Sequence, residues 1–386
     1  MSTARLPRLA YVVNSLNPGG TEKLVYEMSL AFSKQYELLV VCLDDVGRWG
    51  EELRTRGIEV QCVWRQPGMD LSMPRMLARL FRERDVQIVH AHQCTPWFYA
   101  ALSRIYYPAP RLLLEEHGRF YPEITNRPRA LVNRWLIRRL THRFVAVSDD
   151  IRTRLHQYEG LDLDQIEVIY NGVSVQPPLD AAARGALREK LGFAAQDFIV
   201  GTVGRFDPIK NLPMLISAIG SATNRVPALR GLLVGDGPEM LRVKQLLAEK
   251  GLAERIRLTG FRSDARELVQ CMDLFVLSSF SEGTSMALLE AMAAGVAVAV
   301  TRVGGNPEIV KSGETGWVVE SDAAAQLADA ICAAAADDTL RANLAAAGRR
   351  RFTENFDFAR MLDRYAACYA QLRARAAESS STTQVA

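Results

Sequence analysis

Residues 274–295 read LFVLSSFSEGTSMALLEAMAAG, and this run places a strand, a tight turn and a helix in direct succession. Leu274–Leu277 is a short apolar run of the kind that forms buried strands. Gly283-Thr284-Ser285 predicts the turn, and an apolar helix follows it. A strand that leads directly into a helix is the repeating unit of parallel sheets covered by helices. The stretch therefore predicts an α/β fold.

The same alternation of strand and helix runs through the chain in two halves. In the first half, buried strands are expected at Leu9–Val13, Leu38–Cys42, Ile88–His90, Arg111–Glu115 and Phe144–Val147. In the second half, they are expected at Phe198–Thr202, Leu232–Val234, Ile256–Leu258, Leu274–Leu277 and Val296–Val300. Helical patterns between the first strands include Glu22–Ser33, Met73–Arg84 and Arg129–Leu140. We predict two Rossmann-like, doubly wound α/β domains that face each other across a cleft, with ligands at the carboxyl ends of the strands.

The break between the two halves falls around Ser174–Gln196. Pro177-Pro178 continues neither a helix nor a strand, and a polar helix follows at Ala181–Lys190. We expect the following parts: domains over residues 1–176 and 177–357, a last helix over Phe358–Ala376 that packs on either domain, and a disordered Ser/Thr-rich tail over residues 377–386.

The composition is that of an ordinary globular protein, with 48% hydrophobic and 24% charged residues in a chain of 386. The net charge of +3 is too small to predict nucleic-acid binding. The six cysteines form no Cys-x-x-Cys pair, so we expect the reduced thiols of a cytoplasmic protein rather than disulfides or a zinc site. No signal peptide is recognisable, and the longest apolar run, Ala291–Val300, is too short to cross a bilayer. Any membrane contact is therefore expected to be peripheral.

The helix start just after Gly283 has the features of an anion site, because the free N–H groups and the dipole of a helix N-terminus attract phosphate. Glu282 lies at the mouth of the turn, and Glu290 lies about two helical turns further on, at most about 12 Å away. Two carboxylates at that spacing can hold opposite ends of a ligand whose phosphates lie over the helix start. The alternative is a capped helix with two solvated glutamates, but the turn, the strand before it and the apolar helix favour the ligand site.

Two further loops follow directly on predicted strands. Gly201–Asn211 carries Arg205 and Lys210, and such cations neutralise the charge that builds on a departing diphosphate. Asn14–Glu22 carries Gly19-Gly20, which permit close approach of the backbone to a ligand although the G-x-G-x-x-G dinucleotide motif is absent. Each loop taken alone also fits an ordinary solvated connection.

Three histidines, His90, His92 and His117, lie at the ends of strands predicted for the first domain. This position favours hydrogen bonding to a sugar or phosphate, although each histidine alone equally fits a satisfied core residue. Metal binding is another interpretation of His90-Ala-His92, but no Cys, Asp or Glu cluster with ligand spacing lies nearby in the sequence. Asp162-Leu163-Asp164 matches the D-x-D pattern of metal-dependent sugar transferases. Because no strand precedes it, we interpret it as a chance match.

A set of motifs in one order along the chain resembles glycosyltransferase family 4, whose members are retaining enzymes of the GT-B fold: Gly19-Gly20, Gly204-Arg205 with Lys210-Asn211, Gly235-Asp236-Gly237-Pro238, and Glu282 with Glu290. The likeness spans Leu9 to about Tyr369. It implies transfer of a hexosyl group from a nucleotide-sugar, by family frequency a UDP-sugar, to a glycan or lipid-linked acceptor in cell-surface polysaccharide or glycolipid biosynthesis. It also implies that no metal cofactor is needed, and that the last helix returns to the N-terminal, acceptor-binding domain.

The resemblance implies roles for individual residues. Glu290 would bind the ribose hydroxyls, Glu282 would face the transferred sugar, and His117 would help at the reacting centre. Arg205 and Lys210 would hold the donor diphosphate. The remaining donor contacts would come from Gly20, from the turn and helix start at Gly283, Thr284, Ser285 and Met286, and, around the base, from Gly260, Phe261 and Arg262.

The resemblance leaves the donor sugar open, because Gly283-Thr284-Ser285 stands where many members have Gly-Phe-Gly. Two other functions also stay open. One is a nucleotide-sugar epimerase or hydrolase on the same architecture, which would release nucleotide without an acceptor. The other is a non-catalytic nucleotide-sugar-binding protein, which would tolerate loss of the sugar-facing groups.

Between Ile124 and Ser148 every ionisable residue other than histidine is an arginine. Arg134, Arg138 and Arg139 share a predicted helix with Leu131 and Trp135, and such a basic amphipathic helix can rest on an anionic membrane. That contact would place the protein at the cytoplasmic face of the inner membrane. The alternative is a core-packed helix with a solvated basic face. We expect no nucleic acid as a partner, since no recognised binding module accompanies the charge.

Overall fold

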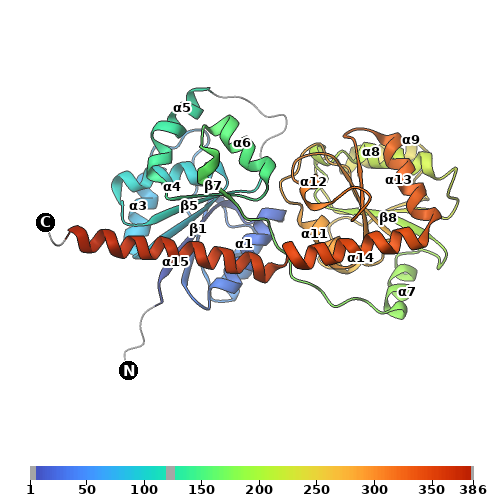
Figure 1. Ribbon diagram of the computed structural model, residues 1–386, viewed down its shortest axis with the longest axis horizontal. Coiled ribbons are helices and arrows are strands. Elements are labelled where there is room, and N and C mark those ends of the chain that lie inside the picture. The colour runs from blue at the N-terminus through green and yellow to red at the C-terminus, as the bar shows by residue number, and fades with distance from the viewer. Residues whose placement is uncertain (1–5, 119–126, 384–386) are drawn as a thin grey trace. The chain divides into compact units, whose positions relative to one another are not determined.

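The computed structural model describes residues 6–118 and 127–383, and the chain divides into two compact units. The first unit comprises Met1–Tyr170 together with Met361–Ala386, and the second comprises Asn171–Arg360. Each unit is a parallel β-sheet with helices packed on it (Figure 1). The predicted α/β fold class with two doubly wound domains is confirmed.

The first unit contains a seven-stranded sheet in the order β3-β2-β1-β4-β5-β6-β7. The order reverses beside β1, which makes the carboxyl ends of β1 and β4 the switch point where such sheets bind ligands. All five residues of β4 are buried, as expected for a strand covered on both faces. The strands are β1 (Arg8–Ser15), β2 (Glu37–Asp45), β3 (Glu59–Cys62), β4 (Ile88–His92), β5 (Arg111–Glu116), β6 (Arg143–Ala146) and β7 (Ile166–Val168).

The helices of the first unit connect these parallel strands, and right-handed crossovers place the helices before β3 on one face and those after β3 on the other. They are α1 (Gly20–Phe32), α2 (Gly47–Thr55), α3 (Met73–Glu83), α4 (Cys94–Tyr106), α5 (Arg127–Trp135), α6 (Asp149–Glu159), and the 3-10 turns η1 (Ile137–Leu140) and η2 (Leu163–Gln165).

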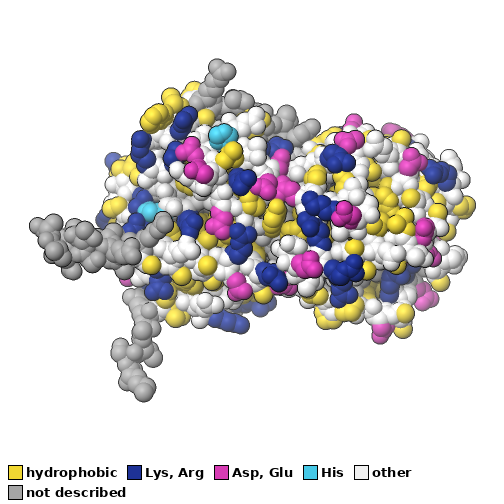
Figure 2. Space-filling model, viewed as in Figure 1, with side chains coloured by type: hydrophobic (Ala, Val, Ile, Leu, Met, Phe, Trp, Pro, Cys, Tyr) yellow, Lys and Arg dark blue, Asp and Glu magenta, His cyan; other side chains and the backbone are white. Residues whose placement is uncertain are grey.

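The helix that the sequence predicts over Arg129–Leu140 is two elements, α5 and η1. The break lies at Leu136, whose φ of −112° departs from the helical value, and the chain continues from there as the 3-10 turn that carries the buried Ile137. Figure 2 shows hydrophobic and basic side chains next to each other over α5.

The second unit contains a six-stranded sheet in the order β10-β9-β8-β11-β12-β13. Its strands are β8 (Phe198–Val203), β9 (Leu229–Val234), β10 (Ile256–Leu258), β11 (Leu274–Leu277), β12 (Ala297–Thr301) and β13 (Trp317–Val319). Its helices are α7 (Ala181–Lys190), η3 (Pro208–Lys210), α8 (Leu212–Ala222), α9 (Met240–Glu249), α10 (Ala265–Val269), α11 (Met286–Ala293), α12 (Asn306–Ile309), α13 (Ala324–Ala336) and α14 (Asp338–Asn355).

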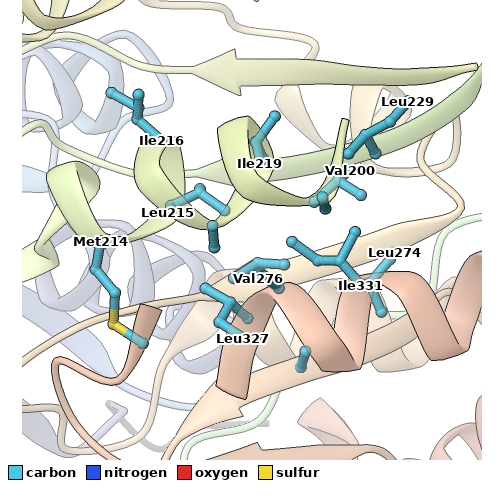
Figure 3. Packing of buried hydrophobic residues seen from close by; sticks show 14 of the residues in the cluster. Val200, Met214, Leu215, Ile216, Ile219, Leu229, Leu274, Val276, Leu327 and Ile331 are labelled. Carbon is cyan, nitrogen blue, oxygen red and sulfur yellow. The ribbon is translucent and has the colours of Figure 1, made fainter. Parts of the chain in front are cut away.

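The core of the second unit lies between its sheet and the helices α8 and α13 (Figure 3). Leu215 and Ile219 of α8, Ile331 of α13 and Val276 of β11 all belong to this core. All four side chains are fully buried. Because β11 leads into the turn at Gly283, this packing fixes the strand that carries the candidate anion site.

The last helix, α15 (Phe358–Thr383), begins in the second unit, and from Met361 its residues belong to the first. Tyr369 packs its ring 5.1 Å from that of Phe32 and 5.7 Å from that of Tyr36, measured between centroids. The helix continues past Ala376 to Thr383. The expectation of a disordered tail over residues 377–386 is therefore wrong for residues 377–383, which are helical. Ala377 and Glu378 are good helix formers and extend the helix before the serine run begins.

Every strand predicted from the sequence is present, whereas three short strands, β3, β7 and β13, were missed. All three are edge strands of only three or four residues, although β10, which is equally short, was predicted. The six cysteines are free thiols, as expected. Within the described residues, no helix is both long and apolar enough to cross a membrane.

Leu215→Ala is expected to lower the free energy of unfolding of the second unit by about 2–5 kcal/mol, because it leaves a cavity in the α8–α13 core. Urea unfolding measures the loss. Leu241→Ala, which truncates a side chain that is 68% exposed, is the control and should cost about 0.5 kcal/mol or less. Equal losses for the two variants would contradict this account of the core.

Candidate functional site

The turn between β11 and α11 is held rigidly at the carboxyl edge of the second unit's sheet. Thr301 at the end of β12 donates its hydroxyl to the carbonyl of Ser279, at 2.7 Å. The amide of Phe280 donates to the carbonyl of Ile209 in η3, at 2.8 Å. Neighbouring strands and loops thereby fix the backbone on both sides of the turn.

The start of α11 is capped by a side chain of the predicted turn. Ser285 is the N-cap, and its hydroxyl accepts from the amide of Leu288 at 3.4 Å. Thr284 is buried, and its carbonyl accepts from the side-chain amide of Asn171 at 3.3 Å. Met286 is the first helical residue, directly after Gly283-Thr284-Ser285. The first amides of α11 are therefore presented from a fixed turn.

Glu282 and Lys210, which come from different loops, form an ion pair beside this helix start. The ammonium of Lys210 lies 2.7 Å from one carboxylate oxygen of Glu282, and the hydroxyl of Ser279 donates to the same oxygen at 2.5 Å. The Glu282 side chain is only 9% exposed. Ion pairs of this kind are strongest where water is partly excluded.

The backbone of Glu282 is held as closely as its side chain. Its carbonyl accepts from the amide of Gly305 at 3.2 Å. A Cβ at Gly304 would lie 1.8 Å from the same carbonyl oxygen, and the φ of +50° there already favours glycine. Only glycine at this position lets the β12–α12 loop approach Glu282.

Glu290 lies further along α11, at a surface hollow of about 250 Å³. Its carboxylate is paired with the guanidinium of Arg266 on α10, at 2.5 Å, and is largely buried. The hollow is lined by Ser174, Gln176, Arg266, Gln270, Glu290, Ala293 and Ala294. Glu282 and Glu290, the two carboxylates of the predicted site, are therefore each paired with a cation instead of being surrounded by solvent.

The loop after β8 lines a second hollow of about 230 Å³, which includes Gly204, Arg205 and Lys210. Arg205 is paired with Asp207 at 3.1 Å, but its side chain remains 62% exposed. The turn after β9 presses against this loop, since a Cβ at Gly235 would lie 1.8 Å from the carbonyl oxygen of Gly204. Arg205 therefore has the freedom to reach an anion, whereas the loop that carries it is constrained.

The residues predicted to lie around the base follow β10 at the same edge of the sheet. The amide of Gly235 donates to the carbonyl of Gly260 at 3.0 Å, which joins the ends of β9 and β10. Phe261 is half exposed, and Arg262 makes two bonds to the carboxylate of Asp264, at 2.7 and 2.5 Å. The structure thus brings all the predicted donor residues of the second unit to the carboxyl ends of β8, β9, β10 and β11.

In the first unit, Gly20 is the exposed first residue of α1, at the carboxyl end of β1. Gly19 before it is in the extended conformation, and a Cβ there would lie 2.1 Å from a carboxylate oxygen of Glu22. The Glu22 carboxylate therefore lies against the backbone at Gly19, whereas Gly20 is exposed to solvent. It lies on the same sheet edge as the ends of β4 and β5, which carry the histidines.

His90, His92 and His117 surround one fully buried carboxylate, that of Glu115. Its Oε2 lies 2.9 Å from His90 Nε2, 3.2 Å from His92 Nδ1 and 3.6 Å from His117 Nε2. Sheet pairing creates the cluster, because His92 on β4 lies directly opposite Glu115 on β5. The sequence shows no acidic cluster with ligand spacing beside His90 and His92, yet the structure places the Glu115 carboxylate between them, because spacing along the chain does not reveal pairing across the sheet.

Three of these residues, His90, His92 and Glu115, have potential ligand atoms within 4.8 Å of one another and could hold a metal ion. A metal ion binds an imidazole nitrogen in the plane of the ring, about 2.0–2.1 Å away. The rings of His90 and His92 are stacked, with centroids 4.0 Å apart and planes 26° apart. Their in-plane lone pairs run alongside each other instead of converging on one point. This geometry fits hydrogen bonding to the carboxylate better than metal coordination.

Helix α15 closes this cluster with tyrosines. The hydroxyl of Tyr369 lies 2.8 Å from His90 Nδ1 and donates to the hydroxyl of Tyr11 at 3.3 Å. Burial raises the pKa of Tyr365 and Tyr369 well above the ordinary value. The tyrosines therefore stay neutral and supply hydroxyl groups beside the buried carboxylate without adding charge.

The carboxylate of Glu115 stays ionised among neutral imidazoles. Burial by itself raises its pKa, but the neighbouring His117, His90 and His92 outweigh burial and hold the pKa well below the ordinary value. Burial lowers the pKa of His92 and of His117 to about 4. At neutral pH the cluster therefore carries one negative charge, and the imidazole nitrogens of His90 and His92, 2.9 and 3.2 Å from the carboxylate oxygen, stabilise it.

His117 faces the cluster with one ring nitrogen and leaves the other available. Its Nε2 lies 3.0 Å from Nδ1 of His92. Its Nδ1 is buried and has no hydrogen-bond partner among the residues that the structure describes. Because one proton lies between the two facing nitrogens when both rings are neutral, His92 determines whether Nδ1 of His117 donates or accepts.

The arginines predicted for a membrane or acceptor contact differ in their partners. Arg138 is paired with Asp162 at 2.7 Å, and Asp162 is the first aspartate of the D-x-D match. The guanidinium of Arg139 lies 5.4 Å from the centre of the Trp135 ring. Arg134 is exposed, and no acidic side chain in the described ranges pairs with it. Arg134 and Arg139 remain available to an anionic partner.

Several residues of the site were not found from the sequence. Arg266, Ser279 and Gly304 have no motif of their own and become visible only through their contacts with Glu290 and Glu282. Glu115 could have been found, because adjacent parallel strands end at one edge and the residue lies two positions before His117.

Comparisons with known proteins identify the family and the fold. The model of Glycosyltransferase Family 4 matches residues 18–176, and that of Glycosyl transferases group 1 matches residues 183–351. N-acetyl-alpha-D-glucosaminyl L-malate synthase of Bacillus anthracis is 27% identical over 317 residues, 80% of each chain. UDP-Gal:alpha-D-GlcNAc-diphosphoundecaprenol alpha-1,3-galactosyltransferase of Escherichia coli is 26% identical over 306 residues, 76% of this chain and 79% of that protein. The solved structure of Anabaena HepE with UDP-glucose has the same fold, with a TM-score of 0.84, 23% identity and coverage of 94% of this chain and 99% of that chain.

Acidification is expected to destabilise the first unit through the histidine cluster. Between the ordinary histidine pKa of 6.5 and the values of about 4 for His92 and His117, the unfolded chain binds protons that the folded chain does not. The free energy of unfolding should therefore fall as the pH falls through this window, by about 1.4 kcal/mol per pH unit for each histidine. The lowered pKa of Glu115 adds a loss of the same sign below its ordinary value of 4.5.

Urea unfolding at a series of pH values measures this slope. His92→Asn should reduce the slope of the unfolding free energy against pH by the contribution of one histidine. His156→Asn, which lies outside the cluster, is the control and should leave that contribution unchanged. A slope that His92→Asn does not change would contradict the account.

Proposed function

The chain belongs to the group 1 glycosyltransferases of the GT-B type, and we propose that it transfers a hexosyl group from a UDP-sugar, with retention of anomeric configuration, to a glycan or lipid-linked acceptor. The observation that carries the proposal is the Lys210–Glu282 ion pair beside the fixed start of α11. The UDP-glucose complex of HepE and the galactosyltransferase activity named for the Escherichia coli relative support the donor and acceptor classes. The destination proposed is a cell-surface polysaccharide or glycolipid.

In this proposal the donor pyrophosphate binds over the first amides of α11. A helix start favours phosphate because its N–H groups lack partners within the helix and its dipole end is positive. Lys210 and Arg205 neutralise the charge that grows on the pyrophosphate as its bond to the sugar breaks. Both cations line the same hollow, and Arg205 is exposed enough to turn toward an anion.

In this proposal the ion pair also positions Lys210 before the donor binds. Before the donor binds, Lys210 is held against Glu282 at 2.7 Å, so its ammonium is already placed near the helix start. When a phosphate competes for the ammonium, the carboxylate of Glu282 is released to accept hydrogen bonds from the sugar hydroxyls. Preplacement of this kind lowers the reorganisation that binding requires.

The other predicted residues complete the proposal. Glu290 accepts from the ribose hydroxyls, Gly260, Phe261 and Arg262 lie near the base, and His117 acts at the sugar through Nδ1. The chemistry proposed is independent of metal, since phosphate charge is neutralised by side chains and backbone amides. The available Arg134 and Arg139, beside exposed Leu131 and Trp135, support a peripheral contact of α5 with the inner membrane.

Glu282→Gln is expected to lower kcat for sugar transfer about 100-fold or more, because it removes the charge that organises Lys210 and faces the sugar. Binding of UDP alone should change little, since the helix amides remain. Transfer is followed as acceptor-dependent release of UDP, and calorimetry measures UDP binding. Glu249→Gln, an exposed glutamate of the same unit, is the matched control.

Two results would contradict the proposal: full transfer activity in Glu282→Gln, or release of nucleotide at the same rate with and without acceptor. The second result would identify a hydrolase or an epimerase that cleaves its donor. Binding without any turnover over a broad set of acceptors would favour a nucleotide-sugar-binding protein.

A thermal-shift series with UDP-, GDP- and ADP-sugars is expected to show the largest rise in Tm with a UDP-sugar. Ligand at 100 times its Kd stabilises the folded state by about 2.7 kcal/mol. Glu290→Ala should reduce the rise, because it removes the group proposed for the ribose. An equal rise in that variant, or a preference for another base, would refute the assignment of Glu290 or of the donor respectively.

A further inference from the structure

A single residue, Gln93, connects strand β4 to helix α4. The strand ends at His92 and the helix begins at Cys94, so the chain changes direction within one residue. The backbone of Gln93 has a φ of +75° and a ψ of 162°, a region that is almost confined to glycine. Strained residues of this kind cluster at ligand sites. The comparable strand-to-helix elbow of α/β-hydrolases presents a catalytic side chain at the edge of the sheet.

Three hydrogen bonds hold Gln93 in this conformation. Its amide donates to the carbonyl of Glu115 on β5, at 2.7 Å, and its carbonyl accepts from the amide of Trp97 in α4, at 3.1 Å. Its side-chain carbonyl accepts from the side-chain NH2 group of Asn14 on β1, at 2.9 Å. Both neighbouring strands and the following helix therefore fix this residue, although glycine would occupy the same backbone conformation without strain.

The Asn14–Gln93 pair spans the switch point of the sheet in the first unit. Val12 lies opposite Ala91 in the register of β1 and β4, so Asn14 lies level with Gln93 two residues further on. Ligands of doubly wound sheets bind in the crevice outside this point. His117, which is proposed to act at the sugar, follows directly on β5, the neighbour of β4. The pair is therefore at the ligand edge of this unit.

The pair leaves one donor group and one acceptor group for a ligand. Each carboxamide has an NH2 group and a carbonyl oxygen. The bond between the two side chains uses the NH2 group of Asn14 and the carbonyl of Gln93, and neither side chain has another hydrogen-bond partner among the described residues. Both side chains are partly exposed. The NH2 group of Gln93 and the carbonyl of Asn14 can therefore both reach a ligand.

We propose that Asn14 and Gln93 form a subsite for a hydroxyl group of a neutral sugar acceptor. The NH2 group of Gln93 donates to the hydroxyl oxygen, and the hydroxyl donates to the carbonyl of Asn14. A carboxylate or a phosphate is a poorer occupant, because its oxygen would face the carbonyl of Asn14 with no proton between them. The inference rests on the proposed function, since it places the acceptor at the sheet edge that carries His117.

Gln93→Gly separates ligand binding from backbone strain. Glycine adopts a positive φ without strain, so the Tm should stay the same or rise. The affinity for a neutral glycoside should fall about tenfold, because the subsite loses its donor. Saturation-transfer NMR measures this affinity on the full chain in the presence of UDP, with the methyl glycosides of glucose, galactose and N-acetylglucosamine as probes.

Two further variants define the contribution of the NH2 group. Gln93→Glu keeps the bond from Asn14 but has no NH2 group, so it should lower the affinity as Gln93→Gly does. Asp85→Gly is the matched control. Asp85 is exposed, also has a positive φ, of +51°, and precedes the opposite end of β4. This control should leave the glycoside affinity unchanged.

Three results would overturn the proposal. They are an unchanged glycoside affinity in Gln93→Gly and Gln93→Glu, a loss of affinity in Gln93→Gly that a lower Tm accompanies, and a wild type that binds none of the three glycosides. Donor binding distinguishes this inference from the proposed function. A chain that binds glycosides through Gln93 but no nucleotide-sugar keeps the subsite and loses the proposed transferase role.

Discussion

The ion pair between Lys210 and Glu282 depends on a constraint that shapes the whole second unit: the carboxyl ends of neighbouring parallel strands meet at one edge. Lys210 follows β8 and Glu282 follows β11, strands that pair directly, so residues far apart in the sequence come within 2.7 Å. Glycine at Gly304 allows the next loop to approach and fix the same backbone. The anion site at α11 is therefore a consequence of strand order, close packing and one capped helix, rather than of any single residue.

The same constraint produces a different result in the first unit. There the pairing of β4 with β5 encloses a carboxylate, that of Glu115, among three imidazoles and the tyrosines of α15. A buried charge is stable only when donors surround it, so this cluster ties the last helix to the strands that carry His117. The catalytic candidate, its tautomer and the docking of α15 are thus parts of one hydrogen-bonded network.

The sequence predicted the features that have a local cause. The ten predicted strands, the turn at Gly283-Thr284-Ser285 and the free cysteines are visible in short windows, and all are present. Features that depend on pairing across the sheet were missed: the short strands β3, β7 and β13, the place of Glu115 beside His92, and the partners Arg266 and Ser279. The break between α5 and η1 was also missed, since no glycine or proline at Leu136 marks it in the sequence.

A crystal structure with an intact UDP-sugar tests the central claim most directly. The account predicts that the phosphate oxygens lie within hydrogen-bonding distance of the amides at residues 284–286, that Lys210 turns from Glu282 toward them, and that Glu282 and Glu290 contact the sugar and the ribose. A nucleotide bound elsewhere, or the two carboxylates directed into solvent while the donor is bound, would contradict it.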